Sequence, residues 1–267
     1  AVGQTATATK NNSIAVGTKT KAEGDNAVGI GAYVESTANR ATAVGVLSQA
    51  NGQGSFAGGA SAQAVGTNSV AIGGATDGTL GNKAGTAAKA TKDNAVSIGT
   101  NSTASIKDSV ALGSNSTTSN FVPTNTATVG TLTYSGFAGN TSALGDGAVV
   151  SVGTAGSERQ IQNVAAGQLT KTSTDAVNGS QLYTVANELD DKINNHHWVV
   201  SGNTTVNAQQ PKESNVYHKD VVEFQNGKGT TATVVNTPAN KSLGQAGKTV
   251  VQYNANIVNG ENTEVVY

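Results

Sequence analysis

Asn68-Ser69-Val70-Ala71-Ile72-Gly73 is one copy of a short phrase that occurs eight times and ends in glycine each time. The step between successive final glycines is 14 residues from Gly3 to Gly73, and it is 14 again from Gly99 to Gly113. Between these runs, and after Gly113, additional residues interrupt the register, so we expect insertions at about 74–93 and 114–147. A fixed period of this length is typical of a solenoid.

Each phrase has the pattern of a short β-strand. The positions one and three before the glycine are mostly Val, Ile or Leu, and the residue between them is small. A period of two predicts a strand with one apolar face. A second phrase follows in many repeats, with Ser or Thr three residues after the glycine. Two short strands and two turns therefore fit into 14 residues, which is one coil of a parallel β-roll with about 4.8 Å between coils.

The final glycine of each phrase predicts a turn with positive φ or a close backbone approach.

We expect the branched side chains to fill the inside of each coil, two per coil. A roll with so thin a core would be too small to be stable alone. We then expect the small residues on the other strand face to pack against a neighbouring roll, because solvent-facing strand positions normally carry Thr, Lys, Glu or Gln. The alternative is that the small residues face solvent. The first interpretation predicts an oligomer. The small residues are Ala15, Gly29, Ala43, Ala57, Ala71, Ser97, Ala111 and Ser151.

Composition excludes several classes of protein. A chain of 267 residues with 36% hydrophobic residues, mostly Ala and Val, cannot fill one large globular core. The net charge of −1 argues against nucleic acid as the main partner. No run of 18 apolar residues predicts a membrane-spanning helix. The absence of cysteine excludes thiol catalysis and thiolate metal sites, and it is compatible with an exported protein. Because the chain begins Ala1-Val2-Gly3, we expect it to be a piece of a longer protein.

A helix is predicted after the repeats. Leu182, Ala186, Leu189 and Ile193 recur at steps of 4, 3 and 4, which predicts a coiled-coil seam of about two heptads. Asp175 or Ser173 could cap this helix. The residues 198–267 read as a small β domain with hairpin turns at Asn226-Gly227 and Asn259-Gly260.

The repeat phrase at 68–73 resembles the head repeat of trimeric autotransporter adhesins. The following neck resembles theirs more specifically, and Trp198-Val199-Val200-Ser201 is similar to the start of the tryptophan-ring module that follows such necks. The segment around Thr131-Leu132-Thr133-Tyr134 alternates, could be a strand, and is similar to an extra hairpin found before some necks of this family. The neck motifs are Arg159-Gln160-Ile161, Asn163-Val164-Ala165-Ala166-Gly167, Thr174-Asp175-Ala176-Val177-Asn178 and Ser180-Gln181-Leu182.

This resemblance implies a mainly β homotrimer in which three left-handed parallel β-rolls lead through a neck into a three-stranded coiled coil. It divides the chain into a head at 1–153, a neck at 154–181, a short coiled coil at 182–197 and a tryptophan-ring-like module at 198–267. It further implies a bacterial surface protein held in the outer membrane by a C-terminal part that is absent here. The residues expected to support the neck and trimer are Arg159, Gln160, Asn163, Asp175, Asn178, Gln181, Leu182, Ala186, Leu189, Ile193 and Trp198.

Residues that could act in catalysis or metal binding are better explained by packing, surface or turn roles. No Gly-x-Ser-x-Gly elbow or phosphate loop is present, so we predict no enzyme activity, no cofactor and no metal. His196 falls on the heptad seam and could hold an ion on a trimer axis; alternatively, the helix has ended and His196 packs beside Trp198. His197 and His218 are expected at the surface. Asp25, Asp93 and Asp108 lack the spacing of a calcium roll and are expected to be turn residues that accept backbone N–H groups.

Three functions stay open at this point. The first is an adhesin head that attaches bacteria by avidity to extracellular matrix proteins, cells, other bacteria or abiotic surfaces. The second is an inert spacer that carries a binding module located elsewhere. The third is a glycan-binding β-solenoid, which would need a groove lined by aromatics and paired carboxylates. Exposed lysines such as Lys10, Lys19 and Lys21 either contact an anionic or matrix ligand or only solvate the roll. The sequence does not identify the ligand.

Overall fold

The computed structural model describes residues 1–75, 86–140, 145–147, 149–201, 213–217, 220–226, 230–238 and 248–255. The chain divides into two compact units, residues 1–178 and 179–267. Among the described residues, no helix combines the length and the hydrophobicity of a transmembrane segment.

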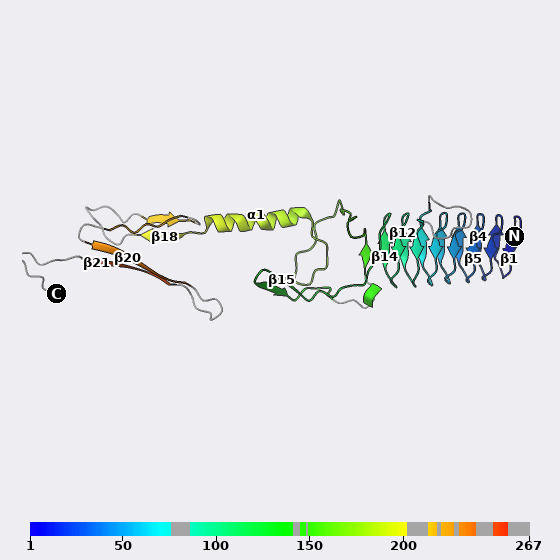
Figure 1. Ribbon diagram of the computed structural model, residues 1–267, viewed down its shortest axis with the longest axis horizontal. Helices are drawn as coiled ribbons and strands as arrows, with labels where there is room; N and C mark the ends of the chain where they lie inside the picture. Colours follow the sequence, from blue (N-terminus) through cyan, green and yellow to red (C-terminus); the bar gives the residue numbers. More distant parts are fainter. Residues whose placement is uncertain are drawn as a thin grey trace, which may run out of the picture. The chain divides into compact units, whose positions relative to one another are not determined.

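The first unit contains a parallel β-roll with two sheets (Figure 1). The first sheet has eight strands in the order β17-β14-β12-β10-β8-β6-β4-β2, and the second has seven in the order β1-β3-β5-β7-β9-β11-β13. We call them sheet A and sheet B. Sheet A consists of β2 (Ile14–Val16), β4 (Val28–Ile30), β6 (Thr42–Val44), β8 (Phe56–Gly58), β10 (Val70–Ile72), β12 (Val96–Ile98), β14 (Val110–Leu112) and β17 (Val150–Ser151). Sheet B consists of β1 (Thr7–Ala8), β3 (Lys21–Ala22), β5 (Glu35–Ser36), β7 (Gln49–Ala50), β9 (Gln63–Ala64), β11 (Lys89–Ala90) and β13 (Thr103–Ala104).

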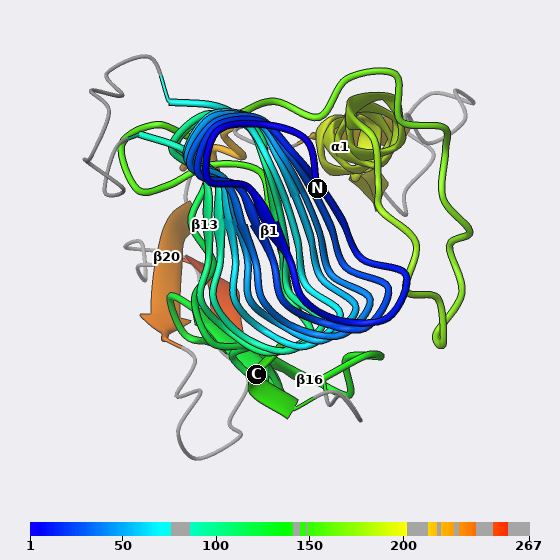
Figure 2. The same cartoon turned by 90° about the vertical axis from the view of Figure 1, so that its right-hand side faces the viewer.

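The pairing register follows the repeat found in the sequence. Val28 pairs with Thr42, 14 residues later, and the same step recurs along both sheets. Across the first insertion Val70 pairs with Val96, and across the second Val110 pairs with Val150, so both insertions lie outside the ladder. Viewed along the stack, successive coils lie over one another (Figure 2). The predicted 14-residue coil is therefore confirmed.

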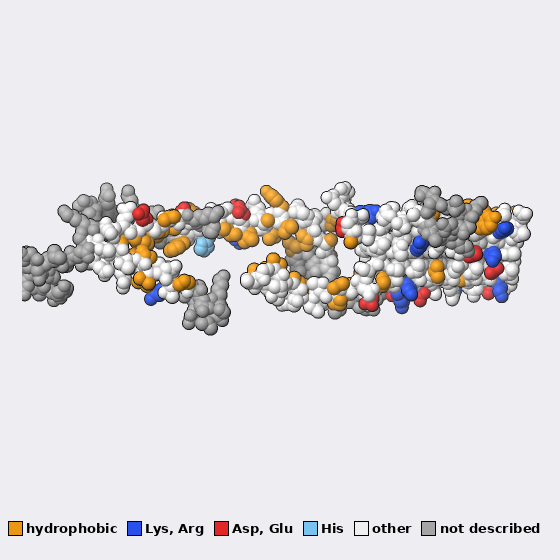
Figure 3. Space-filling model, in the orientation of Figure 1, with side chains coloured by type: hydrophobic (Ala, Val, Ile, Leu, Met, Phe, Trp, Pro, Cys, Tyr) orange, Lys and Arg blue, Asp and Glu red, His pale blue; other side chains and the backbone are white. Residues whose placement is uncertain are grey.

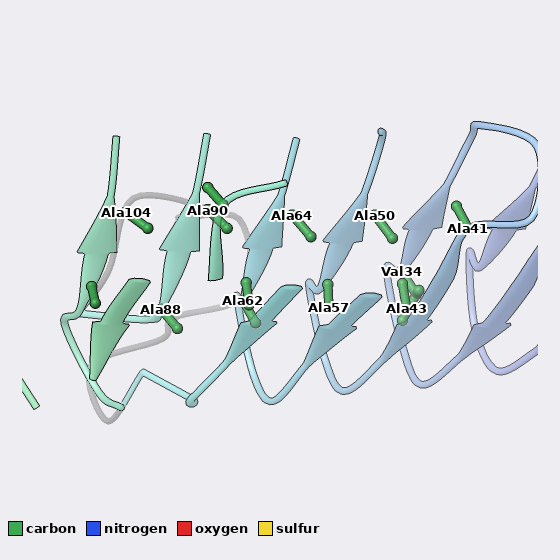
Figure 4. Close-up of a cluster of buried hydrophobic side chains, with 13 residues drawn as sticks. Val34, Ala41, Ala43, Ala50, Ala57, Ala62, Ala64, Ala88, Ala90 and Ala104 are labelled. Carbon is green, nitrogen blue, oxygen red and sulfur yellow. The ribbon is translucent and has the colours of Figure 1, made fainter. Parts of the chain in front are cut away.

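The side chains inside the roll are small, contrary to the expectation from the strand pattern. Ala15, Ala43 and Ala57, in the middle of sheet A strands, are fully buried, and the alanines of sheet B point into the same interior (Figure 4). Ile14, Val16 and their equivalents lie on the outer surface instead. The prediction that branched residues fill the coil, while the small residues pack against a neighbouring roll, was wrong. Two sheets joined by such short turns leave room mostly for Ala, Ser and Gly, with few larger residues such as Val34.

Backbone contacts between coils explain the repeated glycines. Gly17 has a φ of 129°, and a Cβ there would lie 1.8 Å from the carbonyl oxygen of Gly31 in the next coil. The predicted close approach is confirmed.

The Asp and Asn residues of the turns form hydrogen bonds between coils. Asp25 accepts the N–H of Asn11 at 3.2 Å, and Asp93 accepts the N–H of Thr67 at 2.9 Å. Asp108 has a φ of 60° and accepts from the side chain of Asn94 at 2.6 Å. These aspartates are turn residues, as expected, and stabilise the stacking of coils.

The second insertion contains a hairpin, and a short 3₁₀ helix, η1 (Gly145–Gly147), follows it. Strand β15 (Thr126–Val129) pairs antiparallel with β16 (Leu132–Ser135), which confirms the predicted strand near 131–134. Of the first insertion, residues 76–85 lie outside the described part of the chain.

The second unit begins with helix α1 (Gly179–Asn195). Strand β18 (Trp198–Ser201) pairs with β19 (Glu213–Val216), and β20 (Thr230–Thr237) pairs with β21 (Lys248–Ala255), both antiparallel. Residues 220–226 form no strand, and Gly227 of the first predicted hairpin turn lies outside the described residues. The second predicted turn, Asn259-Gly260, lies outside the described residues.

Neither predicted residue caps helix α1. The helix starts four residues after Asp175, whose carboxylate accepts the N–H of Gln168 at 3.0 Å instead. Ser173 accepts the N–H of Asp175 at 3.2 Å through its side-chain oxygen. Asn178 directly precedes the helix.

The tight interior predicts that Gly29→Ala destabilises the roll. A Cβ at residue 29 would lie 2.9 Å from Thr20 Cγ2 and 3.4 Å from Val34 Cγ1. Overpacking of this kind costs about 1–3 kcal/mol, so we expect a lower midpoint of thermal unfolding by circular dichroism. Thr20→Ser removes the nearest methyl group and keeps the hydroxyl that donates to the Gly31 carbonyl. The double variant Gly29→Ala/Thr20→Ser should therefore recover stability relative to Gly29→Ala; Thr20→Ser alone is the control, and additive losses would contradict the packing argument.

Candidate interaction surfaces

The outer side of sheet A is an uncharged apolar surface. Its outward side chains form two columns along the roll, and the most exposed of them retain from 37% (Phe56) to 67% (Val150) of their surface. Only Thr42 and Gly58 interrupt the apolar series. We call this surface the apolar face: Ile14, Val16, Val28, Ile30, Thr42, Val44, Phe56, Gly58, Val70, Ile72, Val96, Ile98, Val110, Leu112 and Val150.

Phe56 fills the gap that Gly58 leaves in the apolar face. The two residues are neighbours on the outward side of β8, and a Cβ at Gly58 would lie 2.9 Å from Phe56 Cε1. The aromatic ring therefore covers the place where other strands of sheet A carry Val, Ile or Leu. The apolar columns continue through this coil.

The outer side of sheet B is polar. One outward residue per coil forms the polar column, which consists of Thr7, Lys21, Glu35, Gln49, Gln63, Lys89 and Thr103. All of these residues are exposed or half-buried.

Contacts between successive coils hold the polar side chains in place. Gln49 Nε2 donates to Glu35 Oε2 at 2.6 Å. On the adjoining turn the Lys19 ammonium lies 5.2 Å from the centre of the Tyr33 ring, a cation–π contact. The side of the roll drawn in Figure 3 shows separate basic and acidic side chains among uncharged groups.

Arg159 in the neck closes the end of the roll. Its guanidinium donates to the Val152 carbonyl at 2.7 Å, to Ser116 Oγ at 3.1 Å and to the Ser114 carbonyl. A Cβ at Gly113 would meet the Arg159 Cζ at 3.1 Å, at a position where other coils have the backbone of the next coil. Arg159 therefore supplies hydrogen bonds to carbonyls at the end of the roll.

The other predicted neck residues lie in a loop that closes on itself. Asn178 Nδ2 donates to the Val164 carbonyl at 3.1 Å. The Asp175 carboxylate accepts the backbone N–H of Gln168 and joins the same two segments of the loop. Asn163 has a φ of 60°, a left-handed conformation that Asn tolerates better than most residues. The side chain of Gln160 is exposed, and that of Gln181 is half-buried.

Glu158 stabilises the turn at the start of the neck. Hydrogen bonds from the backbone N–H groups of Glu158 itself and of Gly156 lower the pKa of its carboxyl group. The Gly156 bond measures 2.9 Å. A lowered pKa means that the ionised group favours the folded turn and that this contribution is lost as the pH falls through the folded-state pKa.

Helix α1 leaves its apolar seam uncovered within one chain. Leu182, Leu189 and Ile193 are exposed, as is Ala186. Val185 is also exposed and was missed, although steps of 3 and 4 from Leu182 through Val185 to Leu189 satisfy the heptad rule equally well.

His196 lies beyond the end of helix α1. It lines a hollow of about 310 Å³ together with Lys192, Ile193, Trp198 and Tyr217, which supports packing beside Trp198 rather than a position on the helical seam. His197 is exposed, as predicted, but its ring also lies 5.0 Å from that of Tyr217. His218 lies outside the described residues. In the described part of the chain no three His, Asp or Glu residues form a group suited to a metal ion.

Arg159→Ala is predicted to loosen the last coil of the roll. The change leaves the Val152 and Ser114 carbonyls without this donor, and each unpaired group costs about 1–3 kcal/mol where it stays shielded from water. Hydrogen exchange measured by mass spectrometry should become faster in residues 100–117 and stay unchanged in residues 14–44. Lys107→Ala, which removes an exposed cation nearby, is the control. Equal exchange in the Arg159→Ala and Lys107→Ala variants would refute the capping role.

Two family models match separate parts of the chain. The family model of the YadA head domain repeat matches residues 1–20, 8–33, 36–62, 50–76 and 85–116. The model of the coiled stalk of trimeric autotransporter adhesins matches residues 160–205. A comparison with curated protein sequences gives no significant match.

Two solved structures are similar to parts of the chain. The C-terminal YadA-like domain of a Burkholderia pseudomallei protein shares 37% identity over 48% of this chain, with a TM-score of 0.30, and the match spans 46% of that structure. The collagen-binding domain of the Yersinia adhesin YadA shares 28% identity over 68% of this chain and 87% of its own length, with a TM-score of 0.44. Because head repeats and a coiled stalk of one family occur here in sequence, and together cover more than half of the residues, the chain belongs to the trimeric autotransporter adhesins.

Proposed function

We propose that this chain is the head of a homotrimeric bacterial surface adhesin, in which the apolar face is buried between three rolls and the polar column contacts the ligand. The observation that carries the proposal is the difference between the outer surfaces of the two sheets. Sheet A presents the uncharged apolar face, and sheet B presents the polar column. An adhesin has to bury the first surface and display the second.

The apolar face needs a protein partner. Monomeric soluble proteins rarely expose continuous apolar patches larger than a few hundred Å². Here the columns continue from β2 to β17, with side chains such as Ile72 and Leu112 exposed by 40% and 45%. Three parallel copies would place equal coils at the same height, so that identical apolar residues meet around an axis. The exposed seam of α1 could continue the same assembly as a coiled coil.

The polar column suits multivalent binding to an extended ligand. It presents amide, carboxylate and ammonium groups at intervals of one coil, about 4.8 Å. A trimer displays the column three times, and many trimers on one cell raise the avidity further without requiring a deep pocket. We propose extracellular matrix proteins, cells, other bacteria or abiotic surfaces as ligands. The site of action is the bacterial surface, with the anchor in a C-terminal part of the protein.

The trimer is tested by light scattering of the 267-residue chain. We expect a mass of three times 26.5 kDa. Val44→Glu/Ile72→Glu places six carboxylates in the buried surface of the trimer, where each unpaired charge costs several kcal/mol, so the mass should fall toward that of one chain.

Gln49→Glu/Gln63→Glu adds the same charge to the polar column and is the matched control. It should leave the trimer intact. A folded monomer for the unsubstituted chain, or a trimer that survives both pairs of substitutions, would refute the assignment of the apolar face.

Ligand binding is tested with a variant of the polar column: Lys21→Ala, Gln49→Ala, Gln63→Ala and Lys89→Ala. Collagen is the first ligand to immobilise, since the Yersinia domain is described as collagen-binding, followed by other matrix proteins and plastic. Each hydrogen bond contributes about 0.5–1.5 kcal/mol, so the fourfold variant should bind at least roughly tenfold more weakly in a surface-binding assay.

Lys10→Ala/Lys107→Ala removes two exposed cations on the turns and should bind normally. Unchanged binding by the fourfold variant would place the ligand elsewhere on the chain. If the unsubstituted head binds none of these materials, and its removal leaves bacterial attachment intact, the roll is a spacer.

A further inference from the structure

The hairpin β15–β16 is amphipathic, and its cross-strand pairs join residues of the same kind. Ala127 pairs with Tyr134 and Val129 with Leu132, whereas Thr126 pairs with Ser135 and Thr128 with Thr133. Because side chains alternate between the two faces of a strand, the first two pairs share one face and the other two pairs share the opposite face. One face is therefore wholly apolar, and the other carries only hydroxyl groups.

The hydroxyl face has internal partners, and the apolar face does not. Thr128 Oγ1 and Thr133 Oγ1 lie 3.1 Å apart and form a hydrogen bond. On the opposite face Val129 is 68% exposed, Leu132 60% and Tyr134 48%. An isolated two-stranded hairpin is marginally stable in water. The register found here thus needs a surface that covers the apolar face.

The neck carries apolar side chains that one chain leaves uncovered. Ile161 is 70% exposed, Leu169 67% and Val177 58%. The chain that returns from the hairpin passes the neck at Gly139, where a Cβ would lie 3.1 Å from Thr174 Cγ2. The segment that follows the hairpin thus touches the neck within one chain, while the apolar side chains of hairpin and neck remain exposed.

A second copy of the chain completes both surfaces. The hairpin and the neck belong to the same compact unit, residues 1–178, and neither covers the other there. The apolar face ends at β14 and β17, the strands that flank the second insertion in the sequence, and the proposed trimer buries this face. Charged residues are absent from the hairpin strands, as is typical of the core of a subunit interface.

We infer that the apolar face of each hairpin packs on the neck of the neighbouring copy, so that the three hairpins form a closed ring around the three necks. This contact is heterologous, with hairpin on one side and neck on the other, and threefold rotation closes it. It rests on the proposed trimer. It assigns the second insertion to assembly rather than to ligand binding.

Disulfide cross-linking tests the contact directly, because the natural chain has no cysteine. Leu132→Cys is combined in turn with Ile161→Cys, Leu169→Cys and Val177→Cys in the 267-residue chain, and each protein is oxidised mildly. We expect at least one pair to give covalent trimers on non-reducing gels. In mixed trimers of ¹⁴N- and ¹⁵N-labelled chains, mass spectrometry should find cross-linked peptides that join the two labels. Thr133→Cys, on the hydroxyl face, combined with the same three partners is the matched control and should not cross-link.

Several results would overturn the inference. Cross-links confined to one chain would show that the hairpin folds onto its own neck. Equal cross-linking from Leu132→Cys and Thr133→Cys would show that the apolar face has no special role. A trimer by light scattering with no cross-link from any pair would refute the hairpin contact alone. A monomer by light scattering would refute the proposed function as well, so the two failures are distinguishable.

A second measurement does not depend on disulfide geometry. Val129→Thr/Leu132→Thr keeps the β-propensity of the hairpin but removes its apolar contact, so hydrogen exchange in residues 160–178 should become several-fold faster. Thr126→Val on the hydroxyl face is the control and should leave exchange in the neck unchanged. Unchanged exchange in the double variant would overturn the inference.

Discussion

The narrow interior of the coil is the constraint on which the rest of this structure depends. Two strands of two or three residues, joined by short turns, bring the two sheets so close that only Ala, Ser, Gly and a few larger residues fit between them. Where a larger side chain does enter, as at Val34, the facing position is Gly29. Backbone approaches such as Gly17 to Gly31 follow from the same tight stacking. Each coil therefore buries little apolar surface per residue, and repeated backbone hydrogen bonds connect it to the next coil.

Because the interior has room for few branched side chains, the Val, Ile and Leu of sheet A lie outside. A strand has only two faces, so the choice of Ala for the inner face directs every alternate residue outward. The consequence is an uncharged apolar face that a single chain cannot cover. The proposed trimer would bury this face. The polar column of sheet B, on the other sheet of the roll, is the surface that we propose for ligand binding.

At the C-terminal end of the roll, the carbonyl groups of the last coil have no further coil with which to form hydrogen bonds. Arg159 supplies donors to the open carbonyls of this end. The neck loop is closed by Asp175 and Asn178. These side chains act within one chain, while Ile161, Leu169 and Val177 remain exposed. The neck therefore combines an internal hydrogen-bonded frame with apolar groups available to other copies, and the hairpin β15–β16 offers a surface of matching chemistry.

Several features could be predicted from the amino-acid sequence alone: the period, the two strands per coil, the positions of both insertions and the turn role of Asp25 and Asp93. The neck motif around Arg159 also indicated the family. A repeat of 14 residues and a run of matched motifs are local patterns, so they can be recognised without knowledge of the tertiary structure. The prediction of which strand face points into the roll was wrong. Alternation in the sequence identifies the two faces of a strand but does not show which face is enclosed. The distance between the two sheets decides which face is enclosed. The cap of α1 and the surroundings of His196 also depended on where the helix begins and ends. The partners of Arg159, up to 45 residues away in sequence, are set by the stacking of coils, which no local pattern contains.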